Sequence, residues 1–295
     1  MEMRILVTGS SGQLGHDVVE EIKSRDLSVF AADRNDLDVT DHTAVATYLD
    51  ACRPDAVIHC AAYTAVDAAE SEKTACRLVN TEAAGNIAEV CGKLGIKMLY
   101  VSTDYVFDGS GTEPFETDHE TGPLNVYGIT KRDGEELVKQ LCPKHFIVRT
   151  SWVFGNYGRN FVKTILRLAD TRDKISVVSD QIGSPTYTRD LAKLLTDMVQ
   201  TEKYGTYHAT NEEYCSFYEF AKEIVGSAGK SLEIVPTTTE EYGAAADRPH
   251  NSRLSKQSLT DAGFERLPTW QNALARFIKE EEKIEKKAAA AKLQK

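Results

Sequence analysis

No apolar stretch in this sequence is long enough to cross a membrane. The longest lies around Val57–Val66, contains His59, and falls far short of the roughly 20 apolar residues that a spanning helix needs. Met1–Thr8 also lacks the long apolar segment of a secretory signal peptide. We therefore expect a cytoplasmic protein that has no membrane partner.

Basic residues are outnumbered by acidic ones. The chain has 35 Lys and Arg residues against 45 Asp and Glu residues, which gives a net charge of −10. Binding to nucleic acid without regard to sequence needs a basic surface, so this balance argues against a nucleic-acid partner. A local basic pocket for a small phosphorylated molecule remains compatible with it.

Closely paired cysteines are absent as well. None of the six cysteines falls in a C-x-x-C pair, which argues against a zinc ribbon and against a thioredoxin-type redox motif. A chain of 295 residues buries enough surface to fold without disulfides. We expect reduced, mostly buried thiols at positions 52, 60, 76, 91, 142 and 215.

The first half of the chain alternates short apolar runs with amphipathic stretches. This alternation predicts a Rossmann-type doubly wound α/β fold, with a parallel sheet that is covered by helices on both faces. The predicted strands are Arg4–Thr8, Leu27–Ala32, Ala56–Cys60, Met98–Ser102 and Phe146–Thr150, and the predicted helices include Ala75–Leu94 and Thr130–Leu141.

A glycine-rich turn connects the first predicted strand to the first predicted helix. Its glycines are Gly9, Gly12 and Gly15, in the spacing G-x-x-G-x-x-G. Glycines let the main chain approach a pyrophosphate, and the free N–H groups of a helix N-terminus bind the anion. We interpret the turn, with Gln13 and Leu14, as part of a dinucleotide site; an ordinary strand–helix turn is the alternative.

The second predicted strand ends at Asp33 and Arg34. An acid about 20 residues beyond the glycines suits the ribose hydroxyls of NAD, and an adjacent arginine suits the 2′-phosphate of NADP. Because both residues are present, the sequence leaves the choice between NADH and NADPH open. Asp38 and Val39 close the same region and are placed near the adenine. An ordinary loop acid beside a solvated arginine is the alternative.

Tyr127 and Lys131 are four residues apart at the start of a predicted helix, so their side chains share one face. A free tyrosine has a pKa of about 10, and acid–base chemistry near neutral pH needs a fixed cation that lowers it. Thr103 stands at the carboxyl end of a predicted parallel strand, where such sheets place their ligands. We predict that Thr103 and Tyr127 share a substrate oxygen; a surface Tyr–Lys pair is the alternative.

The pattern changes after about residue 155. We predict helices over 160–169, 188–199 and 214–228 and strands over 175–178 and 231–235. The sequence thus predicts a dinucleotide-binding domain with the catalytic residues over 1–155 and a smaller, mainly substrate-binding α/β region over 156–280. The charged, Ala-rich tail over 281–295 is interpreted as a fraying terminal helix or as a non-native extension. Long polar loops over 108–125 and 237–251 favour binding roles.

The glycine turn, the S-T-D sequence and the Y-x-x-x-K spacing together resemble the extended short-chain dehydrogenase/reductase superfamily. Further segments are similar, in the same order over about residues 3–275, to the dTDP-4-dehydrorhamnose reductases. These segments are Ala61–Glu70, Ser102–Gly109, Pro123–Gly128, Arg149–Trp152, Asp180–Thr186 and Arg248–Arg253. The resemblance implies that NADPH or NADH reduces the 4-keto group of dTDP-4-dehydro-L-rhamnose, giving dTDP-L-rhamnose.

The resemblance also implies catalytic roles. Thr103 orients the carbonyl group, Tyr127 donates the proton to O4, and Lys131 lowers the pKa of Tyr127 and holds the nicotinamide ribose. Asn80 matches a position that supports a water near the lysine; an ordinary polar residue on a helix is the alternative. The cofactor itself carries the hydride, and the protein positions and polarises the reactants.

Ligand contacts beyond the catalytic residues are implied by the same resemblance. The sugar is contacted by Val66, Asp104, Tyr105 and Trp152. Thr186 borders the nucleotide, and Ala61 and Ala62 contact the cofactor. Trp152 offers an apolar face to a deoxysugar or packs in the core. Arg248 and Arg253 suit the substrate diphosphate, because guanidinium groups pair with phosphate oxygens, or they are exposed charges.

Other functions on this scaffold stay open. Another NDP-sugar 4-ketoreductase, an epimerase or a dehydratase is possible, but the dehydratase pattern resembles T-D-E, and here Tyr105 follows Asp104. The regulatory subunit of methionine adenosyltransferase also resembles this family and binds its partner without catalysis. The complete set of Thr103, Tyr127 and Lys131 argues against that function.

Some members of the family are described as dimers that Mg²⁺ bridges through acidic residues. The resemblance places one such acid at Asp17 and a second near position 189, where this chain has Arg189. Mg²⁺ prefers carboxylate and water oxygens, and a guanidinium would repel it. We therefore expect no metal site, and either a monomer or a homodimer formed without metal.

Overall fold

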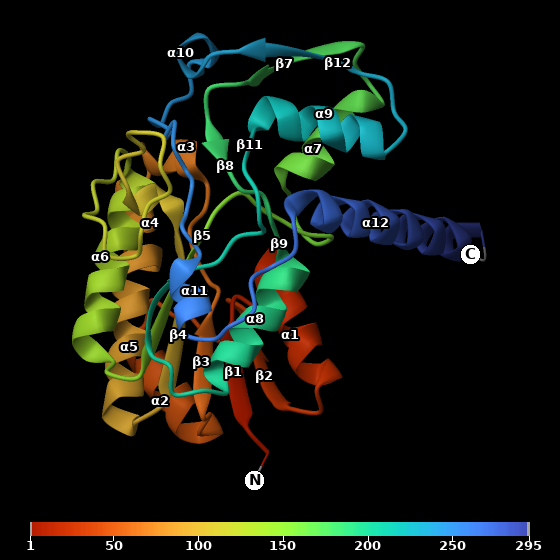
Figure 1. Ribbon diagram of the computed structural model, residues 1–295. Coiled ribbons are helices and arrows are strands. Elements are labelled where there is room, and N and C mark those ends of the chain that lie inside the picture. Colours follow the sequence, from red (N-terminus) through yellow and green to blue (C-terminus); the bar gives the residue numbers. More distant parts are fainter. Residues whose placement is uncertain (1, 294–295) are drawn as a thin grey trace.

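The computed structural model describes residues 2–293. Within them, six parallel strands form a central sheet in the order β10-β5-β4-β3-β1-β2 (Figure 1). The strands are β1 (Arg4–Thr8), β2 (Ser28–Ala32), β3 (Ala56–His59), β4 (Lys97–Thr103), β5 (His145–Thr150) and β10 (Gly205–His208). The first five occupy the apolar runs predicted as strands, and the predicted Rossmann-type sheet is confirmed. The sixth, β10, was not predicted.

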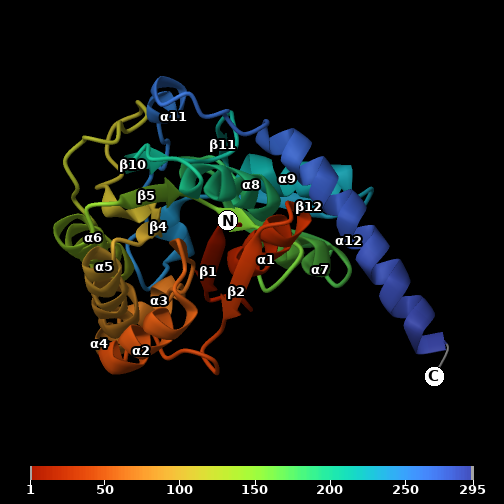
Figure 2. The same ribbon diagram turned by 90° about the horizontal axis from the view of Figure 1, so that it is seen from below.

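Helices cover both faces of this sheet (Figures 1 and 2). The helices are α1 (Gln13–Ser24) and α8 (Thr188–Val199) on one face, and α2 (His42–Cys52), α5 (Ala83–Leu94) and α6 (Val126–Leu141) on the other. Alternate residues of β1 supply both cores: Ile5 and Val7 pack with α1 and α8, whereas Leu6 packs with α2 and α5. Burial on both faces explains why the strands read as continuous apolar runs.

Helix starts follow the capping residues in the sequence. Asp41 begins α2 by accepting hydrogen bonds from the main-chain N–H groups of residues 43 and 44. Asn125 begins α6 by accepting a hydrogen bond from the main-chain N–H of Gly128.

The helix predicted over 75–94 is divided into α4 (Lys73–Arg77), a π-helical turn (Leu78–Glu82) and α5. Amphipathic spacing does not reveal such a turn, which is frequent at functional sites.

A smaller region packs above the carboxyl edge of the sheet (Figure 1). Its core combines aliphatic residues with several aromatic side chains, including Phe154, Phe220 and Phe277. Its helix α9 begins at residue 217 rather than 214, because Ser216 and Glu219 form a capping box there. The elements are β6 (Val153–Phe154), α7 (Phe161–Ala169), β7 (Lys174–Val178), β8 (Ile182–Gly183), β9 (Thr186–Tyr187), β11 (Cys215–Ser216), α9 (Phe217–Ser227), β12 (Glu233–Thr237) and α10 (Thr239–Tyr242).

The chain passes back and forth between the two regions. Residues 188–208 return from the smaller region and form α8 and β10, so a boundary at residue 155 does not separate two structural units. The reason is that the edge strand and a covering helix come from the second half of the sequence. The functional division into a dinucleotide-binding part and a substrate-binding part stays a prediction.

The remaining helices of the described residues are α3 (Val66–Ala69), a short 3-10 helix (Asp104–Val106), α11 (Gln257–Asp261) and α12 (Trp270–Leu293). The end of α12 extends away from the body of the molecule (Figure 2). The predicted tail over 281–295 is helical as far as residue 293, and residues 294 and 295 lie outside the described residues. None of the described helices combines the length and the apolar composition needed to span a bilayer.

A buried ion pair connects α6 to β5. The guanidinium of Arg149 donates to both carboxylate oxygens of Glu135, at 2.9 and 2.7 Å, and the two residues are 2% and 0% exposed. The Ser102 hydroxyl donates to the same carboxylate, and Arg149 Nη1 donates to the Thr117 carbonyl at 3.0 Å. These hydrogen bonds offset the large cost of removing both charges from water.

Replacing Arg149 by Met is expected to lower the free energy of unfolding by about 3–5 kcal/mol, because Glu135 is then buried without its partner. Urea unfolding at neutral pH measures the change. Lys139→Met is the control on the same helix, since Lys139 pairs with Glu136 at the surface and its loss should cost less than about 1 kcal/mol. Equal effects of the two substitutions would contradict the assigned role of the buried pair.

Candidate active site

The glycine turn lies where the order of the strands reverses. The chain leaves β1 for β2 on one side and later returns to β3 on the other. Gly9 has φ +66°, and a Cβ atom there would lie 2.7 Å from the Ala61 nitrogen. A Cβ atom on Gly15 would lie 2.1 Å from the Gly9 carbonyl oxygen. Only glycine fits these two positions, so the turn after β1 packs directly on the chain that follows β3.

This close-packed turn opens α1. Gly12 is the N-cap residue and has no side chain to cap the helix, so no N-cap side chain occupies the first-turn N–H groups. The start of α1 lies at the carboxyl edge of the sheet. Gln13 is held at the helix start, where its side chain donates to the Val153 carbonyl at 3.2 Å and accepts from Asn160 at 2.7 Å. Leu14 packs on the core below. This arrangement fits the pyrophosphate of a dinucleotide, at the place where open α/β sheets bind one.

The residues predicted near the adenosine lie together at the end of β2. The Asp33 carboxylate accepts from the main-chain N–H of residue 35 at 2.7 Å, and the Arg34 side chain is exposed. Hydrogen bonds from Thr40 lower the pKa of Asp38. The Val39 carbonyl accepts from Asn86, which ties this loop to α5. The Ser10 N–H donates to the Ala32 carbonyl at 3.2 Å, which places the start of this loop beside the glycine turn. These contacts do not decide between NADH and NADPH.

Thr103, Tyr127 and Lys131 come together at the end of β4. The Thr103 hydroxyl donates to Asp104 at 3.0 Å and accepts from the Tyr105 N–H at 3.2 Å. Since α6 lies along β4, Tyr127 and Lys131 both face that strand. The Lys131 ammonium donates to the carbonyl of residue 101 at 2.7 Å. The predicted triad is therefore a cluster in the structure, and its catalytic role stays a proposal.

Burial dominates the ionisation of this cluster. It raises the pKa of Tyr127 well above the usual value, although a hydrogen bond with Thr103 acts in the opposite direction. Burial also lowers the pKa of Lys131 to about 7. The Lys131 ammonium donates to a β4 carbonyl, and the lowering of the Tyr127 pKa by Lys131 that the resemblance implied stays a prediction.

A second group of polar residues lies beside the triad. The rings of Tyr105 and Tyr127 meet edge to face, with centres 5.7 Å apart. Arg248 donates to the Tyr105 hydroxyl at 3.3 Å and to the Asp67 carboxylate at 2.7 Å. Arg248 therefore links the loop over 244–254 to α3 beside the triad. Asp104 lies in the same group, and burial raises its pKa to about 6, despite hydrogen bonds from neighbouring hydroxyls.

The remaining predicted substrate residues have different surroundings. Val66 is half-buried at the start of α3. Trp152 is also half-buried, and its ring stacks on that of Phe217 with ring centres 3.6 Å apart. Arg253 donates to the Asn251 side chain at 3.0 Å, so it does not share the partners of Arg248. Thr186 is 0% exposed. It is buried in β9, which pairs with β6, and its contact with the nucleotide stays a prediction.

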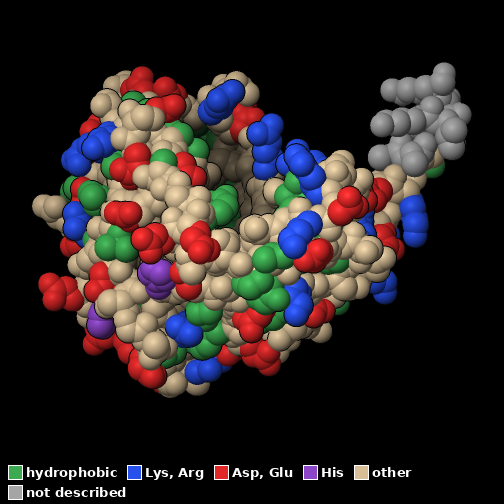
Figure 3. All heavy atoms as spheres, turned by 90° about the horizontal axis from the view of Figure 1, so that it is seen from above, with side chains coloured by type: hydrophobic (Ala, Val, Ile, Leu, Met, Phe, Trp, Pro, Cys, Tyr) green, Lys and Arg blue, Asp and Glu red, His purple; other side chains and the backbone are tan. Residues whose placement is uncertain are grey.

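A hollow lies between the two regions when the molecule is seen from the side of the smaller one (Figure 3). Lys and Arg side chains line part of its rim. These basic side chains favour an anionic ligand, although the chain as a whole is acidic.

A family model described as the RmlD substrate binding domain matches residues 3–283. The chain belongs to this family. The spore coat polysaccharide biosynthesis protein SpsK of Bacillus subtilis is 40% identical over 277 residues, which cover 94% of this chain and 97% of SpsK. The dTDP-4-dehydrorhamnose reductase of Aggregatibacter actinomycetemcomitans is 42% identical over 284 residues, which cover 92% of this chain and 97% of that protein.

A crystal structure from the same family is also similar throughout. It is the dTDP-4-dehydrorhamnose reductase of Bacillus anthracis in complex with NADP, with a TM-score of 0.93 and 44% identity. The match covers 95% of this chain and 100% of that one. The family resemblance predicted from the sequence motifs is thereby confirmed.

Two contacts that hold the site of this RmlD-family chain were not predicted from the sequence, one made by Asn80 and one by Asp67. Asn80 accepts from the Tyr63 N–H at 2.8 Å and donates to the Tyr63 carbonyl at 3.1 Å, so its amide anchors the loop after β3. Its predicted alternative roles did not include this one. Asp67 was quoted in a motif without a role. The only sequence signal for either residue is a polar side chain next to apolar neighbours.

The residues considered for a metal bridge make other contacts in this family member. Asp17 accepts a hydrogen bond from Thr188, and Arg189 lies 3.5 Å from Glu280 on α12. The described residues contain no cluster of three or more His, Cys, Asp or Glu side chains suited to a metal ion. The oligomeric state stays a prediction.

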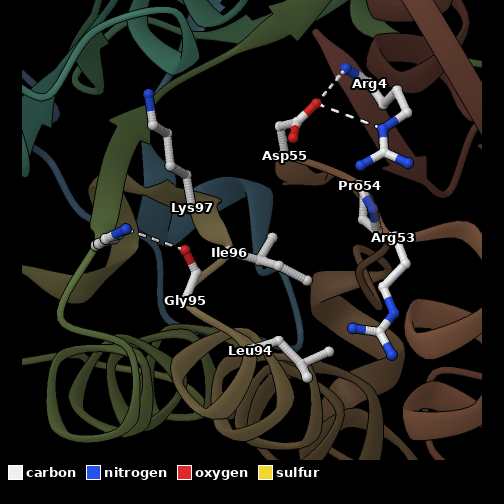
Figure 4. Close-up of a pocket in the computed structure, with 9 residues that line it drawn as sticks. Arg4, Arg53, Pro54, Asp55, Leu94, Gly95, Ile96 and Lys97 are labelled. Carbon is white, nitrogen blue, oxygen red and sulfur yellow. Dashed lines mark hydrogen bonds and ion pairs between the residues drawn. The ribbon is translucent and has the colours of Figure 1, made fainter. Parts of the chain in front are cut away.

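A separate pocket lies at the opposite, amino-terminal edge of the sheet (Figure 4). Its basic side chains are already paired: Arg4 contacts Asp55 at 3.6 Å, and Lys144 donates to the Gly95 carbonyl at 3.2 Å. Gly95 ends α5, so a cation there balances the negative end of the helix dipole. We assign this pocket a structural role.

Replacing Asp104 by Asn is expected to stabilise the protein at pH 7.5. The folded-state pKa of about 6 lies above the value of about 3.9 for unfolded Asp, so the parent loses stability as the pH rises through this window. The advantage of the variant should therefore grow from pH 4 to pH 6.5 and then level off. Thermal unfolding between pH 4 and 8 measures it.

Asp118→Asn, at an exposed carboxyl group, is the control for this pH series and should show no such trend. A difference between Asp104→Asn and the parent that stays constant with pH would contradict the assignment.

Proposed function

We propose that this chain uses NADPH or NADH to reduce the 4-keto group of dTDP-4-dehydro-L-rhamnose, giving dTDP-L-rhamnose. The observation that carries the proposal is the cluster of Thr103, Tyr127 and Lys131 beside a glycine turn that fits a dinucleotide. Membership of the RmlD family supports it. So does the NADP complex of the Bacillus anthracis relative.

The cofactor would be held by the first βα turn and its neighbour. The N–H groups of residues 12–15 would bind the pyrophosphate, and Ala61 and Ala62 would border it from the chain after β3. Gly9 and Gly15 leave the room that a Cβ atom would fill. When bound, the nicotinamide supplies the hydride. Asp33, Arg34, Asp38 and Val39 would bind the adenosine half.

Tyr127 is the proposed proton donor. A general acid must hold its proton at the working pH, and burial, which raises the pKa of Tyr127, favours the protonated phenol. Thr103 lies next to it and would hold the carbonyl oxygen, so that the proton has a short path to O4. Once Tyr127 has given up its proton, the cationic form of Lys131 stabilises the phenolate that remains.

The sugar and the diphosphate would occupy the hollow above the sheet. Asp104 and Tyr105 would contact the sugar beside the triad, with Val66 and Trp152 as its apolar boundary. Arg248 would contact the diphosphate by exchanging its Asp67 partner for phosphate oxygens. Arg253 is proposed for the same anion from a separate position. A cytoplasmic location and a subunit arrangement without metal complete the proposal.

Oxidation of NADPH or NADH, followed by absorbance with enzymatically prepared dTDP-4-dehydro-L-rhamnose, tests the function. In this assay Tyr127→Phe should lower kcat by about 100–10,000-fold, because the proton donor is lost. The dissociation constant of the cofactor should stay within a few-fold of the parent value.

Tyr242→Phe is the matched control, since Tyr242 is 61% exposed on α10, and its activity should equal that of the parent. Tyr127→Phe activity within a few-fold of the parent would refute Tyr127 as the donor.

Arg34→Ala is expected to raise the KM for NADPH much more than the KM for NADH, because only NADPH carries the 2′-phosphate that a guanidinium can pair with. Initial rates with each cofactor measure the two values. Arg53→Ala, at the far edge of the sheet, should leave both unchanged. Equal increases of both KM values for Arg34→Ala would show that Arg34 does not contact the phosphate.

A further inference from the structure

Tyr100 has a fixed and fully buried position below the triad. It lies in β4 directly opposite His59 of β3, and the two rings stack with centres 5.8 Å apart. Its hydroxyl donates to the Asn80 main-chain carbonyl at 3.0 Å. One ring neighbour and one hydrogen bond thus hold this side chain from two directions.

The ring of Tyr100 faces the Lys131 ammonium. The nitrogen lies 3.9 Å from the ring centre, well within the range of a cation–π interaction. Lys131 is 2% exposed, and it makes a hydrogen bond to the carbonyl of residue 101 at 2.7 Å. An ammonium group has three N–H donors, and the aromatic face stabilises charge that this one carbonyl does not satisfy.

A glycine allows helix α6 to lie close to the Tyr100 ring. Gly134 lies on α6, one turn beyond Lys131. A Cβ atom at residue 134 would lie 2.5 Å from the Tyr100 hydroxyl and 2.4 Å from the Asn80 carbonyl oxygen. The absence of a side chain at Gly134 therefore sets the distance between α6 and the Tyr100 ring, and with it the position of Lys131.

We propose that Tyr100 is a positioning residue, whose aromatic face holds the Lys131 ammonium in its charged form and in its place below Tyr127. The proposal rests on the proposed function for its catalytic meaning. The charge state of Lys131, which the proposal concerns, can be measured without any enzymatic activity. Nothing in this role requires Tyr100 to touch substrate or cofactor.

The other titratable groups around Lys131 are either neutral near pH 7 or paired with another residue. Burial lowers the pKa of His59 to about 3 and raises that of Cys60 to about 12, so both are neutral near pH 7. Burial also raises the pKa of Cys76, on α4. Glu135, one turn along α6, favours the charged lysine but is bound to Arg149. A desolvated ammonium gains most from an aromatic face in such surroundings.

The experiment measures the pKa of Lys131 directly, by NMR titration of protein labelled with ¹³C at the lysine ε-carbons. The Lys131 signal is assigned by its loss in Lys131→Met. Tyr100→Phe keeps the ring and should leave the pKa within about 0.3 of the parent value. Tyr100→Leu removes the ring and should weaken proton binding about tenfold, a fall of about one pKa unit.

A second series avoids any dependence on the stability of Tyr100→Leu. Phenylalanines with one, two and three ring fluorines are placed at position 100, which weakens the negative ring face while its shape is nearly kept. The pKa of Lys131 should fall stepwise along this series. The control is Phe264→Leu, which removes the ring 5.1 Å from Lys203 and should leave Lys131 unchanged.

A pKa of Lys131 that does not respond to ring fluorination would overturn the proposal, as would equal shifts for Tyr100→Phe and Tyr100→Leu. The pH profile of kcat/KM is then compared with the titration, and its alkaline limb should move to lower pH with the pKa of Lys131. Fluorine-dependent titration in a protein without reductase activity would support the role of Tyr100 and refute the proposed function.

Discussion

The buried pair of Glu135 and Arg149 is the contact on which the arrangement of the site depends. Glu135 shares α6 with Tyr127 and Lys131, and Arg149 lies in β5 next to Ser102 of β4. Moving α6 along the sheet would separate two charges that have no access to water, so the helix has one permitted position. Arg149 also contacts the His208 ring of β10. One side chain thus connects α6, which carries Tyr127 and Lys131, to the edge strand β10.

Much of the fold could be predicted because parallel strands that are buried on both faces must be apolar throughout. β1 to β5 stand out for this reason, and the glycine turn after β1 marks the nucleotide side. β10, with the sequence G-T-Y-H, does not stand out, because it is a short edge strand that begins with glycine. The π-helical turn at Leu78–Glu82 is hidden for another reason: its five residues continue the helical spacing on either side.

The triad could be predicted because its chemistry fixes both residue types and spacing. Its supports could not, since each joins residues that are distant in sequence. Asn80 reaches back to Tyr63, Arg248 reaches back to Asp67, and no periodicity in the chain records either pairing. Burial is equally hard to see: Thr186 follows a turn with Gly, Ser and Pro, yet the pairing of β9 with β6 removes it from solvent. Residue type predicts chemistry better than it predicts burial.

The sheet of this protein is finished late in synthesis. Between β5 and β10, the growing chain must first produce the 54 residues of positions 151–204, which include β6 to β9 and α7 of the smaller region and then α8. Until residue 208 has emerged, one edge of β5 offers unpaired N–H and carbonyl groups, and the core under α8 is uncovered. Such edges and apolar faces attract other chains. The order of elements therefore leaves the nascent first half with an unpaired strand edge, and a fragment that ends near residue 155 would keep that edge permanently.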